Sequence, residues 1–230
     1  MAQIQLENVT KSYPGDGETV SAVNGASLSV SKGEFVSIVG HSGSGKTTLL
    51  SLIGGIVRPT SGSVLFEGGD IFSLNSDGLS SYRSEKIGFM FQFASLLPML
   101  TVKENLILPT LFSETKREEA DGNTCQEKAE KLIHMVGLGD KLNSYPAQLS
   151  GGQQRRVAIA RAFMNGPAVI LADEPTGDLD EETEQDMMDF FSSMNRSDGI
   201  TFLMVTHNSD LANQAKRKLR MHKGVLEERP

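Results

Sequence analysis

Gly40-His41-Ser42-Gly43-Ser44-Gly45-Lys46-Thr47-Thr48 is the stretch that decides the fold. It matches the pattern G-x-x-x-x-G-K-[ST], in which a glycine-rich turn wraps a phosphate chain. Residues 35–39 before it read as a buried strand, and residues 49–53 after it predict a helix. A strand that turns sharply into a helix leaves the first N–H groups of the helix unpaired, at the positive end of its dipole. The stretch therefore predicts an anion site, and we expect it to bind a nucleoside triphosphate.

The residue types in this loop have separate predicted tasks. A Cβ atom at Gly43 or Gly45 would block close approach of the backbone or a positive φ. Lys46 can reach the β- and γ-phosphates, and the Thr47 hydroxyl can ligate Mg²⁺. His41 is expected to matter through its backbone rather than its ring. The predicted nucleotide-binding residues of the loop are Gly40, His41, Ser42, Gly43, Ser44, Gly45, Lys46, Thr47 and Thr48.

Composition predicts a soluble globular protein. Of the 230 residues, 38% are hydrophobic and 22% are charged, and no segment approaches the ~18 apolar residues needed to cross a bilayer. Residues 1–6 lack the pattern of a secretory signal, and the single cysteine, Cys125, favours a reducing compartment. The net charge of −7 argues against broad nucleic-acid binding, so no nucleic-acid partner is expected. The basic run at residues 216–220 is predicted to be a solvated helix face.

Strand and helix patterns alternate along most of the chain, as in a doubly wound α/β sheet. The apolar cluster around Met187 and Phe191 is predicted to pack in the core. The tail, with turn residues Lys223 and Gly224, predicts a closing hairpin or a short helix and strand. The predicted core strands are residues 35–39, 87–92, 169–172 and 200–205, and the predicted helices beside them are residues 49–53, 154–164 and 181–194.

Two regions depart from this alternation. Residues 4–9 predict a short edge strand, followed by a polar loop that contains Tyr13. Together with residues 26–30 and 63–66, this strand indicates a small antiparallel layer beside the parallel core. Residues 93–148 are helical in texture, which indicates an inserted helical subdomain.

Three motifs follow one another in a fixed order: the phosphate loop, Leu149-Ser150-Gly151-Gly152-Gln153, and Val169-Ile170-Leu171-Ala172-Asp173-Glu174-Pro175. With them, the chain resembles the nucleotide-binding subunit of an ATP-binding cassette (ABC) transporter over nearly its whole length. The resemblance implies a RecA-like P-loop NTPase fold, with a parallel sheet core, an antiparallel β layer and an inserted α-helical subdomain. It implies one domain over residues 1–230, with a catalytic lobe at 1–92 and 160–230 and a helical insert at about 93–159. The implied activity is transport-coupled hydrolysis of ATP to ADP and phosphate.

A narrower likeness is to the lipoprotein-releasing, macrolide-exporter and cell-division branch of that family. It is carried by Leu96-Leu97-Pro98, by residues 101–105 ahead of Leu108-Pro109, and by Pro175-Thr176-Gly177 ahead of Leu179-Asp180. This branch implies export or extraction of a lipid-linked or amphipathic cargo through a separate transmembrane permease. The helical insert near residues 92–105 would grip that permease, and the chain would sit peripherally on the cytoplasmic face of the inner membrane. The alternative is an ABC ATPase that moves no solute and controls cell-wall remodelling or division through a membrane partner.

Adjacent carboxylates end the buried strand at residues 169–172. Asp173 and Glu174 therefore lie at the carboxyl edge of the predicted sheet, beside the phosphate loop. We expect Asp173 to hold Mg²⁺ and Glu174 to orient and polarise the water that attacks the γ-phosphate. A pair of helix-capping acids is the structural alternative.

Three further side chains are candidates for the nucleotide site. Gln92 is the last residue of a predicted core strand, where the chain enters the helical insert. There its amide can contact the metal or the attacking water; a plain surface glutamine is the alternative. His207 follows the strand at 200–205, where it can hydrogen-bond the γ-phosphate and help to place Glu174; a packed histidine is the alternative. Tyr13 matches the family's adenine-stacking aromatic residue, and an ordinary surface tyrosine is the alternative.

A second anion site is predicted at Ser150, Gly151, Gly152 and Gln153, where a hydroxyl and bare backbone open a helix. The resemblance implies that two copies pack head to tail, so that this turn caps the γ-phosphate held by Lys46 of the partner. Asp178, Leu179 and Asp180 match the segment that crosses the dimer boundary. The family commonly has Asn or Ala where this chain has Asp178. The acidic run after it also favours a helix start through the helix dipole.

Overall fold

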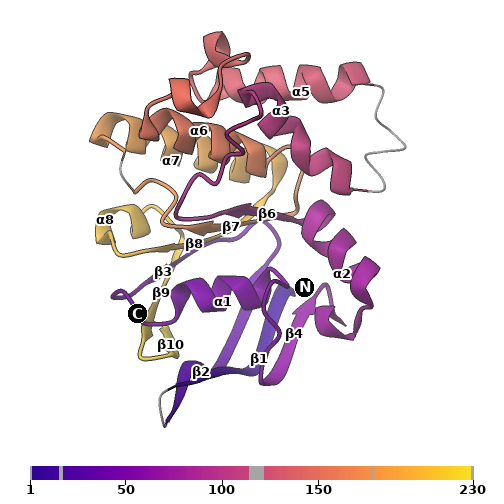
Figure 1. The fold of residues 1–230 in the computed structure, drawn as a ribbon. Coiled ribbons are helices and arrows are strands. Elements are labelled where there is room, and N and C mark those ends of the chain that lie inside the picture. The colour runs from indigo at the N-terminus through magenta and orange to yellow at the C-terminus, as the bar shows by residue number, and fades with distance from the viewer. Residues whose placement is uncertain (1, 16–17, 114–121, 178, 229–230) are drawn as a thin grey trace.

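The computed structural model describes residues 2–15, 18–113, 122–177 and 179–228 (Figure 1). Within them, a six-stranded sheet and a four-stranded sheet lie on either side of one helix, and further helices cover the outer face of the six-stranded sheet. The strands are β1 (Ala2–Pro14), β2 (Thr19–Ser31), β3 (Phe35–Val39), β4 (Ser61–Phe66), β5 (Gly69–Asp70), β6 (Ile87–Met90), β7 (Val169–Asp173), β8 (Thr201–Thr206), β9 (Arg217–His222) and β10 (Val225–Glu228). The helices are α1 (Lys46–Ile53), α2 (Ser76–Ser81), α3 (Val102–Ile107), α5 (Gly122–Met135), α6 (Gly151–Ala162), α7 (Glu181–Asp198) and α8 (Ser209–Ala212). Short helical turns are η1 (Ile71–Ser73), η2 (Tyr82–Lys86), η3 (Leu108–Phe112), η4 (Gly139–Lys141) and η5 (Pro146–Gln148).

The six-stranded sheet has the strand order β10-β9-β3-β8-β7-β6. Its strands pair in parallel, except that β10 runs antiparallel to β9. The predicted parallel core is therefore confirmed. Strand β8 lies between β3, which leads into the phosphate loop, and β7, which ends in Asp173. The parallel pairing still brings the carboxyl ends of all three strands to one edge.

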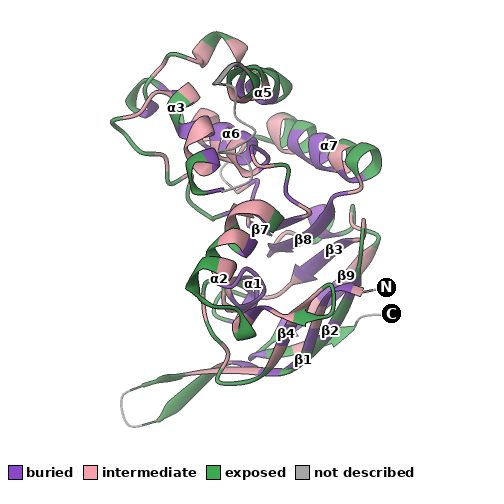
Figure 2. Ribbon diagram, turned by 90° about the vertical axis from the view of Figure 1, so that its right-hand side faces the viewer, coloured by how far each residue is buried: buried purple, intermediate pink, exposed green. Residues whose placement is uncertain are grey.

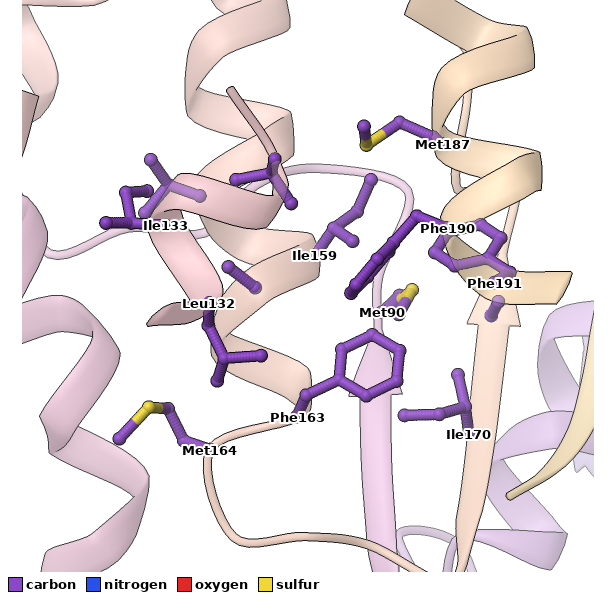
Figure 3. Close-up of a cluster of buried hydrophobic side chains, with 14 of the residues drawn as sticks. Met90, Leu132, Ile133, Ile159, Phe163, Met164, Ile170, Met187, Phe190 and Phe191 are labelled. Atoms are coloured by element: carbon purple, nitrogen blue, oxygen red, sulfur yellow. The ribbon is translucent and has the colours of Figure 1, made fainter. Parts of the chain in front are cut away.

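Alternate residues of the central strands face two different cores. In β7, Val169 and Leu171 pack toward α1, whereas Ile170 and Ala172 pack toward α6 and α7. Figure 3 shows the second core, in which Phe163 and Phe190 lie close together beside Met90 and Ile170. The ring centroids of Phe163 and Phe190 are 5.0 Å apart in an edge-to-face arrangement, a geometry that aromatic pairs favour. The predicted core role of Met187 and Phe191 is confirmed, since both are buried there.

The antiparallel layer is larger than the sequence predicts. Its strand order is β2-β1-β4-β5, so β1 pairs on both sides and is not an edge strand. The prediction of a polar loop after residue 9 is also wrong, because Lys11 to Pro14 continue β1 and pair with Thr19 to Val23 of β2. This part of the hairpin is largely exposed (Figure 2), so burial leaves no alternating pattern in its sequence. Tyr13 accordingly lies in a strand.

The helical region runs from α3 to α6 and covers one end of the six-stranded sheet (Figure 1). Helix α3 begins with a capping box between Thr101 and Glu104. Helix α6 begins at Gly151, earlier than predicted, because Ser150 caps its first turn. The predicted boundary between residues 159 and 160 lies inside this continuous helix. None of the helices in the described ranges has the length and apolar character needed to span a bilayer.

The predicted closing hairpin is present as β9 and β10. The prediction that the basic run forms a helix face is wrong. Arg217, Lys218 and Arg220 lie in β9, where basic residues alternate with buried Leu219 and Met221. Strand β9 pairs with β3, and Arg217 forms ion pairs with Glu34 and Glu228. Pairing with the core sheet therefore decides the conformation of this segment.

Candidate nucleotide-binding site

The phosphate loop packs closely against strands β2 and β9. Gly45 is the N-cap of α1 with φ of 104°, and Gly43 has φ of 75°. A Cβ at Gly45 would collide with the carbonyl oxygen of Ala22, whereas a Cβ at Gly43 would meet open space. Gly45 is thus required for packing, and Gly43 for its left-handed backbone.

A cavity of about 870 Å³ opens beside this loop. Among the described residues, its lining brings together most of the predicted site: His41, Ser42, Gly43, Ser44, Gly45, Lys46, Thr47, Thr48, Gln92, Asp173, Glu174, Leu179 and His207. Predicted site residues absent from that lining are Tyr13, Gly40, Ser150, Gly151, Gly152, Gln153 and Asp180. Asp178 lies outside the described residues.

Lys46 is folded back onto the loop. Its Nζ donates hydrogen bonds to the carbonyl oxygens of Gly40, at 2.7 Å, and His41, at 3.2 Å. Ser44 Oγ, in the same loop, is buried and has no hydrogen-bond partner among the described residues. The loop therefore has spare hydrogen-bonding capacity for an anion. The Lys46 ammonium group can leave the carbonyl oxygens for a stronger acceptor, and the Ser44 hydroxyl is still unsatisfied.

Asp173 ends β7 as a buried carboxylate. Burial raises its pKa above the ordinary value, and the negative charge of Glu174 adds to the effect. The Thr47 hydroxyl, which hydrogen-bonds the carboxylate, and the positive charge of Lys46 act in the opposite direction. The carboxylate therefore lies against the loop in a position where additional positive charge would stabilise its ionised form.

Glu174 is held at its backbone and at its side chain. Its φ of 47° is left-handed, which turns the residue away from the strand alternation and lets both Asp173 and Glu174 line the cavity. Its N–H donates to the carbonyl of Val205 at 2.9 Å. Thr206 Oγ1 donates to Glu174 Oε2 at 2.9 Å, and His207 Nδ1 lies 2.9 Å from Oε1. The carboxylate thus has a fixed direction, while the His207 ring remains largely exposed to the cavity.

Comparison with known proteins decides the family. A family profile described as ABC transporter matches residues 23–177. The chain belongs to the ABC transporter family. The cassette is 43% identical to the lipoprotein-releasing system ATP-binding protein LolD of Syntrophus aciditrophicus, over 97% of this chain and 98% of that protein. It is 43% identical to the macrolide export ATP-binding/permease protein MacB of Rhodopirellula baltica, over 98% of this chain and 32% of that protein. The cassette thus spans about a third of the length of MacB.

The dimeric structure of the ATP-binding cassette MJ0796 in a post-hydrolysis state, bound to ADP and Pi, resembles this cassette with a TM-score of 0.92. The two are 40% identical over 98% of each chain. Together with the family match, this confirms the predicted fold class: a P-loop NTPase with a parallel core sheet and an antiparallel layer.

Tyr13 does not line the cavity, but it lies in the hairpin that contributes Ala22 to the lining. It pairs with Val20 across the hairpin, two residues from Ala22, which does line the cavity. Lys11 Nζ lies 5.1 Å from the centroid of the Tyr13 ring. The ring is partly exposed, so the cassette presents an aromatic face beyond the phosphate loop, held by a cation–π contact.

The Ser150 turn of the cassette is not part of the lining of its own cavity. Ser150 Oγ accepts the N–H of Gln153 at 3.2 Å, and Gln153 Oε1 accepts the N–H of Ser150 at 2.9 Å. This capping box leaves the N–H groups of Gly151 and Gly152 as the unpaired donors of the helix N-terminus. The turn is therefore an exposed anion-binding shape.

Asp180 is the N-cap of α7. Its carboxylate accepts hydrogen bonds from the N–H and hydroxyl of Thr183, which lower its pKa. The predicted helix start is thus confirmed. Leu179 packs against α6, where a Cβ at Gly152 would lie 3.3 Å from Leu179 Cδ2.

Sequence reasoning missed two residues of the cavity lining whose side chains hold Glu174. Thr206 precedes His207 at the end of β8, and this position at the catalytic edge is a signal that could have identified it. Arg155 lies on α6, and its Nη1 donates to the carbonyl oxygen of Glu174 at 3.0 Å. Its role depends on how α6 is placed over β7, which the sequence does not reveal.

Proposed function

We propose that the cassette hydrolyses ATP, with its phosphate loop holding the triphosphate and Glu174 acting on the attacking water. The single observation that carries this proposal is the direction of the Glu174 carboxylate. A left-handed backbone, Thr206 and His207 hold it in the same cavity as Lys46. A fixed carboxylate beside a phosphate-binding loop suits positioning of water, which is most of what phosphoryl transfer needs from a protein.

In this mechanism, Lys46 exchanges the loop carbonyls for β- and γ-phosphate oxygens. Glu174 then polarises a water molecule toward the γ-phosphorus, and His207 hydrogen-bonds the γ-phosphate from the same edge. Tyr13 stacks on the adenine ring, and Gln92 contacts the water or the metal from the segment that follows β6. ADP and phosphate are the products.

Mg²⁺ fits the residues at this site. The described residues contain no group of three His, Cys, Asp or Glu side chains that could hold a metal by themselves. Mg²⁺ characteristically uses one or two carboxylates together with phosphate oxygens, so a single aspartate beside the loop is suitable. Thr47, Asp173 and Gln92 would supply its protein oxygen ligands. When bound, the ion neutralises charge on the β- and γ-phosphates.

A second copy of the cassette completes each site. The Ser150–Gln153 turn is an anion-binding shape that its own cavity does not use, and the MJ0796 cassette is described as a dimer with ADP and Pi. We assign this turn to the γ-phosphate of a partner packed head to tail. Leu179 and Asp180, with Asp178, would lie at the boundary between the copies.

Separate transmembrane permease subunits are the proposed membrane partner. A cavity of about 360 Å³ lies between the helical region and β6, and its lining includes Phe89, Pro109 and Phe112 together with Arg83 and Arg161. Phe93 and Met99, at the start of the helical region, are about three-quarters exposed. A short helix of the permease suits this groove, and LolD, which is named an ATP-binding protein of a releasing system, supports a permease in separate subunits. We also propose the two-lobe division of the chain, with the insert at about residues 93–159, and residues from both proposed lobes line this groove.

The cargo follows from the relatives. LolD is named for lipoprotein release and MacB for macrolide export, both of which concern amphipathic or lipid-linked molecules. We infer export or extraction of such a cargo, with the cassette on the cytoplasmic face of the inner membrane. Co-purification with a permease that carries a large extracytoplasmic domain is expected. An importer permease with a separate solute-binding protein would contradict the export direction.

Glu174→Gln tests the catalytic proposal. The variant keeps the shape of the side chain and its contact with Thr206, so ATP binding should persist while hydrolysis becomes very slow. Phosphate release measured in single turnover gives the rate, and calorimetric titration gives the affinity. Turnover at the rate of the unaltered protein would remove Glu174 from the reaction.

A further inference from the structure

The main chain of Glu174 adopts a conformation that its neighbours must maintain. A left-handed φ is unfavourable for a residue with a Cβ, so the φ of 47° at Glu174 persists only because surrounding contacts determine it. The carbonyl oxygen of Glu174 accepts the N–H of Gly177 at 3.2 Å, which closes a tight turn. The same oxygen accepts Arg155 Nη1 at 3.0 Å. Two donors from different segments therefore converge on one atom of the proposed catalytic residue.

Arg155 reaches this oxygen from the helix that carries the Ser150 turn. Its side chain is 7% exposed and lines the nucleotide cavity. A Cβ on Gly177 would lie 3.6 Å from Arg155 Nη2, so the guanidinium spans the turn from Glu174 to Gly177. Arg155 follows the helix N-cap, Ser150, by less than two helical turns. One rigid element thus carries both the exposed anion-binding turn and the group that holds Glu174.

We propose that Arg155 is a positioning residue, which fixes the backbone that aims the Glu174 carboxylate and ties that carboxylate to helix α6. The inference rests on the proposed function, since it assigns a control to the same site. When Ser150–Gln153 closes on the phosphate of the partner, α6 moves as a unit, and Arg155 transmits the movement to Glu174 of its own protomer. Each nucleotide site then senses whether the other site is engaged.

Arg155→Met and Arg155→Lys test the positioning role. Methionine removes the donors at similar length, and lysine keeps a cationic donor. A small misplacement of a catalytic group costs up to ~100-fold in rate, so kcat of Arg155→Met should fall roughly 10- to 100-fold. ATP affinity should stay within about twofold, because the hydrogen bond that is lost ends on the main-chain carbonyl of Glu174 and acts on the position of its carboxylate. Arg155→Lys should be faster than Arg155→Met.

The matched control is Arg156→Met. Arg156 is the next residue on α6, and its Nη1 donates to the carbonyl of Val136 at 3.1 Å, outside the nucleotide cavity. Its loss should leave kcat close to that of the unaltered protein. Urea unfolding of all the variants verifies that each rate is measured on folded protein.

A double-mutant cycle with Glu174→Gln separates positioning from general support of the fold. If Arg155 acts through Glu174, then Arg155→Met should slow the residual hydrolysis of Glu174→Gln no further. Equal loss in both backgrounds, or unchanged kcat in folded Arg155→Met, would overturn the inference. Those results leave the proposed function standing, since that function fails only if the unaltered cassette is inactive or Glu174→Gln turns over normally.

Discussion

Thr206→Val removes one hydrogen bond to the Glu174 carboxylate and keeps the size of the side chain. Thr206 is 1% exposed, and its Oγ1 lies 2.9 Å from Glu174 Oε2. A hydrogen bond to a charged group contributes about 1.5–3 kcal/mol. If that contribution is needed in the transition state, its loss slows the reaction by roughly 10- to 150-fold. We therefore expect kcat to fall at least about tenfold, with little change in ATP affinity.

The assay separates this loss from a loss of stability. Thr206 Oγ1 also accepts the N–H of Asn208 at 3.0 Å, and valine leaves that N–H without its partner. An unsatisfied buried donor costs about 1–3 kcal/mol, so the free energy of unfolding should decrease as well. Urea unfolding measures the decrease, and phosphate release is then followed under conditions where the variant is fully folded.

Thr206→Ser is the control for this prediction. Serine retains the hydroxyl that donates to Glu174 and accepts from Asn208, so its kcat should remain near that of threonine. Folded Thr206→Val with a kcat within twofold of the unaltered protein would refute the reasoning. A serine variant as slow as the valine variant would do the same, because the lost hydrogen bond could not be the cause.

Three further predictions concern binding of the nucleotide. Lys46→Ala should weaken ATP binding at least ~10-fold in calorimetric titration, because a charge-assisted phosphate contact is lost; unchanged affinity would exclude Lys46 from the site. Tyr13→Ala should weaken it by about 1–3 kcal/mol and Tyr13→Phe far less, if the ring stacks on adenine; equal loss in both variants would argue against stacking. The pKa of Asp173 is raised by burial, so its stabilising effect in the nucleotide-free protein is present below the ordinary carboxyl pKa and disappears as pH rises through the raised value. Asp173→Asn should therefore raise the urea midpoint of the nucleotide-free protein at pH 7 and reduce Mg²⁺-dependent ATP binding, and a lower midpoint would contradict this.

Local sequence signals predicted the centre of the fold well. The phosphate loop, the buried strand that ends in Asp173 and the strand before His207 each carry their own signal in a few adjacent residues. Parallel pairing then brings their ends together, because β3, β8 and β7 are neighbours in one sheet. The cavity lining at Lys46, Asp173 and His207 is the direct result.

Features that depend on distant partners were harder to predict. The exposed part of β1 is a strand because β2 pairs with it, and the basic run of β9 is a strand because β3 does. The left-handed backbone at Glu174 is not predicted by its residue type, because such a conformation is usually marked by a glycine. Arg155 reaches the carbonyl oxygen of Glu174 because α6 packs beside it. Tertiary contacts decide these features, so periodicity and propensity along the chain do not reveal them.

The central claim is that one triphosphate is held by Lys46 of one copy and by Ser150–Gln153 of the other. The most direct measurement is the mass of Glu174→Gln with and without ATP and Mg²⁺, by light scattering on gel filtration, alone and combined with Ser150→Arg. The account predicts an ATP-dependent dimer for Glu174→Gln, and a monomer that still binds ATP when Ser150→Arg is added. An ATP-loaded Glu174→Gln that remains a monomer, or a dimer that forms equally well with Ser150→Arg, would contradict it.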